Sequence, residues 1–415
     1  MKVTHVITGL AFGGAQMMLC KLLSSLDRAV CTAEVISLCD IGPLGKRIQE
    51  LGVPVRALGL RPGMPNPRGV FQLARWLRQD PPHLLQTWLY HADLIGGLAA
   101  KLAGSIPVAW NIRHSNLDAT NDKRATRWTV RACATLSQWL PDRIVCCSES
   151  SQQVHAALGY AAHKMVVIPN GFDLTAFKPD PLARLAVRRE LGIHEEAPLI
   201  GLAGHFRAQK DHRTFVHAAA RLHIDLPDVH FLLCGNDITW DNPKLSHWIT
   251  AAGIRDRCHL LGRRDDMPRL TAALDIATLT SAHGEGFPNV IGEAMACGLP
   301  CVVTDVGDSA LIVGDTGKAV PPQDPLALAQ AWRTLLMLDP AGKARLGEAA
   351  HSRVEEHFNL PLIVTRYRLL YEELANNSSL HVYPLHIDQQ VHYIDQQGKK
   401  DEFAVVPPAN TPPGV

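Results

Sequence analysis

Short apolar runs alternate with longer stretches of helical pattern along this 415-residue chain, and the rhythm occurs twice. Parallel strands cannot be joined by a tight hairpin, so each needs a crossover of helix length before the next. The alternation therefore predicts an α/β protein with two doubly wound, Rossmann-like domains. Strands are expected at residues 3–8, 32–38, 53–58, 83–88, 107–113, 143–148 and 164–169 in the first set, and at 198–204, 229–235, 257–262, 276–281 and 300–305 in the second.

A segment rich in Pro, Asp and Gly, residues 169–183, lies between the two sets and has the composition of a linker. We expect the two domains to face each other across a cleft, because doubly wound sheets bind ligands at the carboxyl ends of their strands. The predicted parts are an N-terminal domain at 1–172, a C-terminal domain at 173–359, a helix at 360–376 that packs back towards the N-terminal domain, and a disordered tail at 377–415.

Composition narrows the function classes. Lys and Arg together number 41 against 40 for Asp and Glu, so no global positive field favours nucleic acid. The start of the chain lacks a signal-peptide pattern, and no window approaches the ~20 apolar residues that span a bilayer, which predicts a cytoplasmic protein. The ten cysteines include no C-x-x-C and have no metal-like His spacing around them, so we expect reduced, buried thiols and no metal site. No cofactor is expected.

A glycine-rich turn follows the first predicted strand. The segment "ITGLAFGGAQMMLCKLL" contains Gly9, Gly13 and Gly14 before an amphipathic helix. Glycine lets the backbone approach a ligand closely, and the helix N-terminus presents N–H groups that suit a phosphate. The spacing is not that of a dinucleotide fingerprint, so a plain tight turn is the alternative.

Two glutamates mark the segment "SAHGEGFPNVIGEAMACGLP", residues 281–300. A helix is predicted to start at Pro288 and to end at Gly298, which puts Glu285 in the preceding loop and Glu293 in the second helical turn. Glu293 suits the diol of a ribose, and Glu285 suits hydroxyl groups of a second sugar. A diphosphate between them would lie near the segment formed by Phe287, Pro288, Asn289 and Val290. All of these residues except Pro288 have a backbone N–H group that could donate to it. Alternatively, both glutamates are surface charges.

Further stretches occur in a characteristic order: "FGGAQ", "IPNGFD" at the linker, "GHFRAQKDH", and "TGKAVPPQDPLALAQA". Together with the two-glutamate segment, this combination resembles family-four retaining glycosyltransferases of the GT-B fold, over roughly residues 1–375. The resemblance implies metal-independent transfer of a sugar from a nucleoside diphosphate donor, usually UDP-linked, to a glycan or lipid-linked acceptor. It also implies an acceptor-side N-terminal domain and a donor-binding C-terminal domain.

The same resemblance assigns roles to particular residues. Glu285 would contact the donor sugar, Glu293 the ribose, and Lys210 the departing diphosphate, with Gly13 and Gly14 touching that phosphate from the first domain. A fixed ammonium is suited to this role, because negative charge grows on the phosphate as the glycosidic bond breaks.

Two positions depart from the family pattern. His205 stands where an arginine is common, so phosphate stabilisation would depend more on Lys210, with Arg207 as a substitute. Gln16 stands where glutamate is more common, and no function is inferred from it.

The acceptor side is predicted from residues that follow two neighbouring strands. His91 follows the strand at 83–88, and Arg113, His114 and Asn116 follow the strand at 107–113. The resemblance implies that His114 hydrogen-bonds the donor sugar or the acceptor; the alternative for both histidines is that they cap strand ends.

A basic helical segment at 122–139 carries Trp128 and Trp139 among arginines. It suits peripheral contact with an anionic membrane at the inner face, or is simply a solvated helix face.

Other activities remain open on the sequence. A dehydrogenase would need a better dinucleotide fingerprint. A UDP-sugar epimerase or hydrolase would need no acceptor pocket, and a noncatalytic nucleotide-sugar binder would dispense with Lys210.

Overall fold

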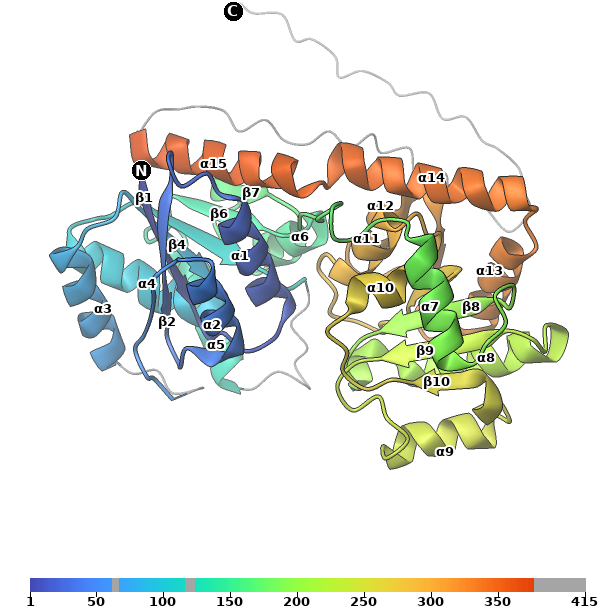
Figure 1. Cartoon of the computed structure of the whole chain (residues 1–415). Helices are drawn as coiled ribbons and strands as arrows, with labels where there is room; N and C mark the ends of the chain where they lie inside the picture. The colour runs from blue at the N-terminus through green and yellow to red at the C-terminus, as the bar shows by residue number, and fades with distance from the viewer. Residues whose placement is uncertain (62–66, 116–123, 377–415) are drawn as a thin grey trace, which may run out of the picture. The chain divides into compact units, whose positions relative to one another are not determined.

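A computed structural model describes residues 1–61, 67–115 and 124–376 (Figure 1). These residues belong to one compact unit by their internal contacts, and it contains both sheets described below. The predicted tail at 377–415 lies outside the described residues.

The first sheet contains seven parallel strands in the order β3-β2-β1-β4-β5-β6-β7. Its strands are β1 (Lys2–Ile7), β2 (Thr32–Ser37), β3 (Val55–Ala57), β4 (Leu84–Trp88), β5 (Val108–Ile112), β6 (Arg143–Cys146) and β7 (Met165–Val167). The helices between them are α1 (Gly14–Ser25), α2 (Gly42–Glu50), α3 (Pro67–Gln79), α4 (Tyr90–Ala103), α5 (Arg124–Leu136) and α6 (Glu149–Ala157), and a 3₁₀ turn, Ala162–Lys164, precedes β7. The strand order reverses between β1 and β4, which is where ligands bind in such sheets.

The second sheet contains six parallel strands in the order β10-β9-β8-β11-β12-β13. Its strands are β8 (Leu199–Ala203), β9 (His230–Cys234), β10 (Cys258–Leu260), β11 (Ile276–Leu279), β12 (Cys301–Thr304) and β13 (Lys318–Val320). The accompanying helices are α7 (Pro181–Leu191), α8 (His212–Asp225), α9 (Pro243–Ala251), α10 (Met267–Ala272), α11 (Asn289–Ala296), α12 (Ser309–Val313) and α13 (Pro325–Leu336), with 3₁₀ turns at Ala208–Lys210, Arg255–Arg257 and Gly314–Thr316. The order reverses between β8 and β11.

Every predicted strand is found, and the prediction of two doubly wound sheets is confirmed. Strand β13 was not predicted, because it is only three residues long and starts with two exposed residues, so it lacks an apolar run. The ten cysteines carry no disulfide, and nine of them are buried.

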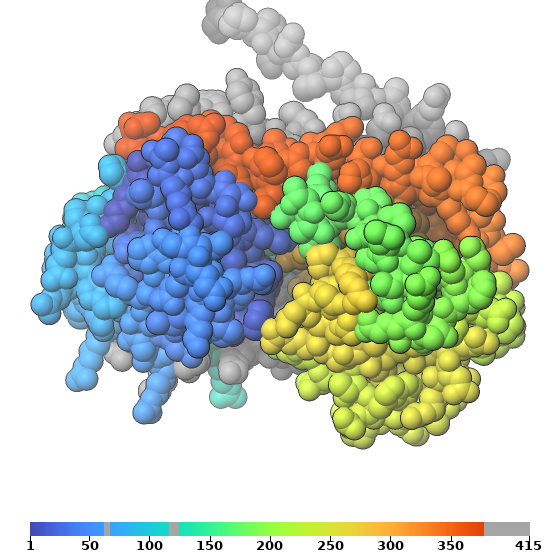
Figure 2. Space-filling view, viewed as in Figure 1, coloured from blue at the N-terminus to red at the C-terminus, as the bar shows by residue number. Residues whose placement is uncertain are grey.

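The last two described helices pack on elements that accompany different sheets. Helix α14 (Pro340–His357) packs on α11, whereas α15 (Leu360–Asn376) packs on α1 and β4. In Figure 2 the two helices form a continuous band of surface. At the point where the chain passes from α14 to α15, Phe172 pairs with Asn359, so the outgoing and returning connections lie side by side.

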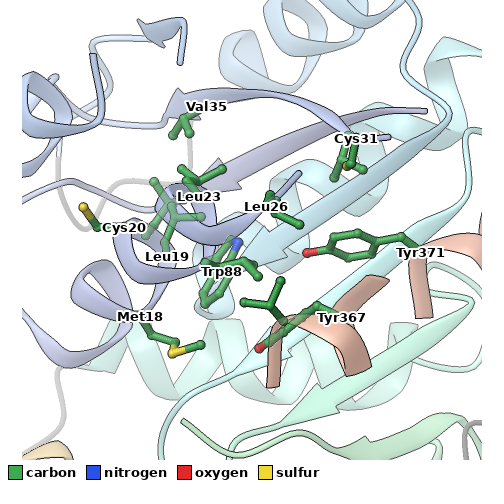
Figure 3. Packing of buried hydrophobic residues seen from close by; sticks show 14 of the residues in the cluster. Met18, Leu19, Cys20, Leu23, Leu26, Cys31, Val35, Trp88, Tyr367 and Tyr371 are labelled. Atoms are coloured by element: carbon green, nitrogen blue, oxygen red, sulfur yellow. The ribbon is translucent and has the colours of Figure 1, made fainter. Parts of the chain in front are cut away.

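Aromatic side chains dominate the core beneath α15. Tyr367 stacks on Trp88 with ring centroids 6.2 Å apart, and both Tyr367 and Tyr371 are fully buried (Figure 3). Met18 and Leu23 of α1 belong to the same cluster. This helix is therefore part of the core of the first sheet, although it follows the second sheet in the sequence.

Candidate active site

Lys210 and Glu285 meet at the switch point of the second sheet. Lys210 ends the 3₁₀ turn that follows β8, and Glu285 lies in the loop that follows β11, the strand beside β8. The Lys210 Nζ lies 2.6 Å from Glu285 Oε1. Asp211, with φ 45°, turns the chain into α8 directly after the lysine, in a left-handed conformation that aspartate tolerates. The sheet topology therefore brings together two residues 75 positions apart.

The Glu285 loop is held by its neighbours. Ser281 Oγ donates to the same Glu285 Oε1 at 2.6 Å, and Gln209 donates to the Gly284 carbonyl at 3.0 Å. The hydroxyl of Ser115, which follows β5 in the first sheet, donates to the Glu285 carbonyl. Glu285 is consequently buried in a defined orientation, unlike the surface charge considered as an alternative.

Glu293 lies in the second turn of α11, as predicted, and pairs with a lysine from the first sheet's helices. The Lys21 Nζ of α1 lies 2.9 Å from Glu293 Oε1. A close contact sets the position of α11, because a Cβ on Gly292 would lie 2.1 Å from the ring of Phe172. The segment "IPNGFD" thus fits against α11 only where α11 carries glycine.

The glycine turn faces the start of the same helix. Gly13 is the N-cap of α1 in an extended conformation, and a Cβ on Gly14 would lie 3.5 Å from Asn289 Nδ2. The side chain of Gln16 donates to the Gly9 carbonyl at 3.1 Å, so this departure from the family pattern closes the turn. The N-termini of α1 and α11 are therefore neighbours, and both present backbone N–H groups.

The four residues at the start of α11 differ in surroundings. Phe287 is buried and stacks on Phe172 with centroids 6.1 Å apart, so its ring belongs to the core. Pro288 is the helix N-cap. Asn289 Oδ1 is a buried oxygen without a hydrogen-bond partner among the described residues. Val290 lines, with Glu293, a cavity of about 30 Å³, which is too small for a nucleoside.

His205 and Arg207 follow β8 on the approach to Lys210. Burial, aided by the cations of Arg207 and Lys210, lowers the pKa of His205, which favours a neutral imidazole there. Arg207 is exposed. Near this loop, the guanidinium of Arg263 lies 4.0 Å from the ring centre of Phe12 in the glycine turn, a contact that the sequence did not suggest.

The predicted acceptor-side residues have separate environments. His114 is exposed, stacks on Tyr90 with centroids 6.1 Å apart, and accepts a hydrogen bond from Ser151 Oγ at its carbonyl. His91 lies in the first turn of α4, where burial lowers its pKa. Asn116 lies outside the described residues.

Arg113 takes part in a hydrogen-bonded chain that sequence reasoning missed. Its guanidinium donates to Asn170 Oδ1, to Asn111 Oδ1 and to Tyr367 Oη of α15. Asn170 Nδ2 in turn donates to the Phe287 carbonyl at 2.8 Å. These hydrogen bonds therefore link α15 to the loop before α11. Only the presence of Asn170 in "IPNGFD" could have pointed to them.

Family models match both halves of the chain. The model described as "Glycosyltransferase Family 4" matches residues 12–176, and the model described as "Glycosyl transferases group 1" matches residues 197–337. Together they span well over half of the sequence. The first match includes Gly13 and Gly14 of the glycine-rich turn, and the second includes the two-glutamate segment.

Curated relatives are similar over part of their length. A galactosyltransferase of Escherichia coli, "UDP-Gal:alpha-D-GlcNAc-diphosphoundecaprenol alpha-1,3-galactosyltransferase", is 24% identical over 249 residues, which are 59% of this chain and 64% of that protein. The N-acetyl-alpha-D-glucosaminyl L-malate synthase of Bacillus anthracis is 31% identical over 196 residues, 46% of this chain and 49% of that protein. The chain thus matches between about half and two thirds of these relatives.

Solved structures resemble the whole fold. Anabaena HepE in complex with UDP aligns with a TM-score of 0.79 and 23% identity over 89% of this chain and 98% of that chain. The sucrose-phosphate synthase of Thermosynechococcus elongatus aligns with a TM-score of 0.76 and 20% identity over 91% and 100% of the two chains. At these identities the likeness concerns the fold, which is GT-B. From the two family matches and this fold, the chain belongs to the family-four glycosyltransferases.

Proposed function

We propose that this protein is a retaining glycosyltransferase that moves a sugar from a nucleoside diphosphate donor, UDP in the first instance, to a glycan or lipid-linked acceptor without a metal ion. The observation that carries the proposal is the 2.6 Å contact between Lys210 and Glu285 beside the N-terminus of α11. In this proposal residues 1–172 bind the acceptor and 173–359 bind the donor.

Lys210 is proposed to stabilise the leaving diphosphate. An ammonium has three N–H donors, and Glu285 Oε1 uses one of them, so two remain for phosphate oxygens. The first turns of α1 and α11 add backbone N–H groups around Gly14 and Asn289, which are neighbours, since a Cβ on Gly14 would lie 3.5 Å from Asn289 Nδ2. Negative charge develops on the β-phosphate as the bond to the sugar breaks, so these donors act most strongly in the transition state.

Glu293 and Asn289 are proposed to bind other parts of the donor. The Glu293 carboxylate can accept from the two hydroxyl groups of a ribose, and one of its oxygens already accepts from Lys21. Asn289 Oδ1, which has no hydrogen-bond partner within residues 1–61, 67–115 and 124–376, is a further acceptor for a donor hydroxyl group. Glu285, held by Lys210 and Ser281, would accept from hydroxyl groups of the transferred sugar.

Retention of the anomeric configuration is proposed to occur on one face of the sugar. The bond from the anomeric carbon to the β-phosphate oxygen breaks, the bond from the same carbon to the acceptor oxygen forms, and the acceptor proton passes to the departing phosphate oxygen. His114, exposed after β5, would hydrogen-bond the donor sugar or the acceptor. His91 and Arg113 would support the acceptor side, Arg113 through the hydrogen bonds already described.

The names of similar proteins support the donor and acceptor classes. HepE was solved with UDP, and the E. coli relative is named for a UDP-linked galactose and a diphosphoundecaprenol-linked acceptor. A lipid-linked acceptor would bring the protein to the inner face of the membrane. A UDP-sugar epimerase or hydrolase and a noncatalytic nucleotide-sugar binder are the alternatives to be separated by experiment.

The test combines donor binding with product analysis. A thermal-shift screen of UDP, GDP and ADP sugars identifies the base, because a ligand that binds only the folded state raises its stability with the logarithm of ligand concentration. Glu293→Ala should weaken binding of the matching donor, with a loss of roughly 1.5–3 kcal/mol for its charge-assisted hydrogen bonds. Glu348→Ala, at an exposed position of α14, is the matched control.

The product then identifies the reaction. Transfer gives a new glycoside with the anomeric configuration of the donor. Hydrolysis gives free sugar at the same rate with and without an acceptor, and epimerisation gives a changed nucleotide sugar. Inversion of the anomeric centre, or unchanged donor affinity in Glu293→Ala, would contradict the proposal.

A further inference from the structure

Helices α3, α4 and α5 form one layer on the first sheet. Helix α4 contacts α3 on one side and α5 on the other, and the inward faces of the three share one apolar core with the sheet. The guanidinium of Arg78 in α3 donates to the Leu102 carbonyl at the end of α4, which ties these two helices together. The outward faces of these three helices are here called the α3–α5 face.

The exposed charged side chains of the three helices are all basic. The only acidic residue within them is Asp93, which is fully buried under the layer, whereas the chain as a whole is nearly neutral. The basic residues are Arg68, Arg75, Arg78, Lys101, Arg124, Arg127 and Arg131. A local positive field of this kind favours an anionic partner.

Large apolar side chains are interleaved with these cations. Trp128 is 69% exposed, Phe71 66% and Trp139, just after α5, 65%. Along α5 the exposed residues Arg124, Trp128 and Arg131 follow helical spacing, so they lie on one face. Arg131 lies 5.9 Å from the Trp128 ring centre.

The same pattern recurs on α3. Arg68, Phe71 and Arg75 are exposed at intervals of three and four residues, so a phenylalanine lies between two arginines on the outward side. Leu102, at the end of α4, is a further exposed apolar residue between the two helices. Two separate helices of the layer thus present aromatic side chains flanked by arginine.

We propose that the α3–α5 face rests on the surface of an anionic lipid bilayer. Tryptophan and phenylalanine bury their rings at the boundary between headgroups and acyl chains, while arginine reaches lipid phosphates with its aliphatic stem packed below. None of the described helices is long and apolar enough to cross a bilayer, so attachment would be peripheral. Nucleic acid would use the arginines equally well, but it offers no apolar environment for Leu102.

This inference deepens the proposed function by naming the surface on which a lipid-linked acceptor would be met. Its test involves no sugar transfer, so the two proposals can fail separately. The full chain is floated with vesicles of phosphatidylcholine alone and with vesicles that contain about 30% phosphatidylglycerol. We expect binding only to the anionic vesicles, reduced when salt is raised from about 0.1 M to about 0.5 M. Tryptophan emission should shift to the blue on binding.

Two pairs of variants separate the α3–α5 face from general surface effects. The charge reversal Arg75→Glu with Arg131→Glu should weaken vesicle binding roughly tenfold or more, since each basic residue contributes measurably at an anionic surface. The control Arg213→Glu with Arg221→Glu changes the charge equally on exposed positions of α8 and should leave binding within about twofold of the parent.

The apolar contribution is tested in the same way. Trp128→Ser should reduce binding and most of the blue shift, whereas Ile224→Ser, at an 81% exposed position of α8, should not. Thermal melts check that each variant is folded, and Trp128→Phe should retain most binding. Equal losses in both charge pairs, equal binding to neutral vesicles, or binding of duplex DNA or RNA without vesicle binding would overturn the proposal.

Discussion

Lys21 in α1 and Glu293 in α11 are 272 residues apart in the chain, yet their side chains form an ion pair of 2.9 Å. Both side chains are mostly buried, with 14% and 17% of their surface exposed. Lys21 Nζ also lies 5.6 Å from the ring centre of Phe172. The proposed ribose-binding carboxylate is thus held by a cation from the other sheet's helices.

Removal of one partner from this pair should destabilise the protein. Lys21→Met leaves a mostly buried carboxylate without its cation, and we expect the free energy of unfolding to fall by about 1–3 kcal/mol. Lys21→Met combined with Glu293→Gln should recover part of this loss, because the unpaired charge is gone. Urea denaturation of the four proteins of the cycle measures the coupling, and additive losses would contradict it.

Lys210→Ala should lower kcat far more than it weakens donor binding. The ammonium interacts most strongly when charge has developed on the phosphate, so the loss should be on the order of 100-fold or more in kcat. Steady-state kinetics and titration with the donor measure the two quantities separately. Equal losses in kcat and in affinity would indicate uniform binding instead, and Lys244→Ala should change neither.

Asn170 should act as a positioning residue for the loop before α11. Asn170→Ala removes the donor to the Phe287 carbonyl and one of the three acceptors of the Arg113 guanidinium, which should cost about 1–3 kcal/mol of stability. Asn170→Asp keeps an acceptor for Arg113 but cannot donate to Phe287 when ionised. We expect the Asn170→Asp variant to be more stable than Asn170→Ala. Its affinity for UDP should nevertheless be lower than that of the parent protein. Parent-like UDP affinity in Asn170→Asp would refute this role.

Activity should survive treatment with EDTA. Phosphate stabilisation is assigned to Lys210, to the glycine turn and to the first turn of α11, so no divalent ion is needed in the proposed mechanism. The transfer rate is measured after dialysis against chelator and again after addition of magnesium or manganese. A rate that depends on added metal would show that Lys210 does not carry the phosphate charge alone.

His155 should make the protein less stable in mild acid. Burial lowers the pKa of His155 to about 4, while its Nδ1 donates to the Ser151 carbonyl at 2.7 Å and its Nε2 accepts from Tyr90 Oη at 2.8 Å. The unfolded chain binds the proton near pH 6.5, and the folded chain only near pH 4. The contribution to stability is therefore complete above about pH 6.5 and is lost as pH falls towards 4, by about 3 kcal/mol in all.

This pH dependence is measured by urea unfolding at pH 7 and pH 5. His155→Gln cannot titrate, so it should lose less stability between the two pH values than the parent does. A parent and variant that lose the same amount would exclude His155 as a source of the dependence.

Local sequence patterns were sufficient to predict every strand except β13 and the two-sheet architecture. The alternation of short apolar runs with helix-length stretches can be recognised within each segment, without information about distant parts of the chain. The predicted helix start at Pro288 is one residue before the observed start of α11 at Asn289, and Glu293 lies in the second turn as predicted, because Pro288 and Gly298 mark helix ends locally.

The predicted site residues come together through contacts between distant segments, and no local pattern encodes such contacts. Lys210 and Glu285 both follow strands, but only the adjacency of β8 and β11 brings them to 2.6 Å. The partner of Glu293, by contrast, was not predicted at all. Lys21 has no motif, and nothing near it in the sequence distinguishes it from a surface lysine.

Arg113 illustrates the limit most clearly. Its sequence position after β5 suggested the acceptor side, whereas its guanidinium bonds to Asn170 and to Tyr367, which is 254 residues away. The segments that form strands, with the exception of β13, and the positions of the family motifs could be predicted from local patterns, because backbone periodicity and helix ends are local properties. The contacts between side chains could not be predicted in this way, because strand order and the return of α15 to the first sheet depend on apolar burial between segments far apart in the chain.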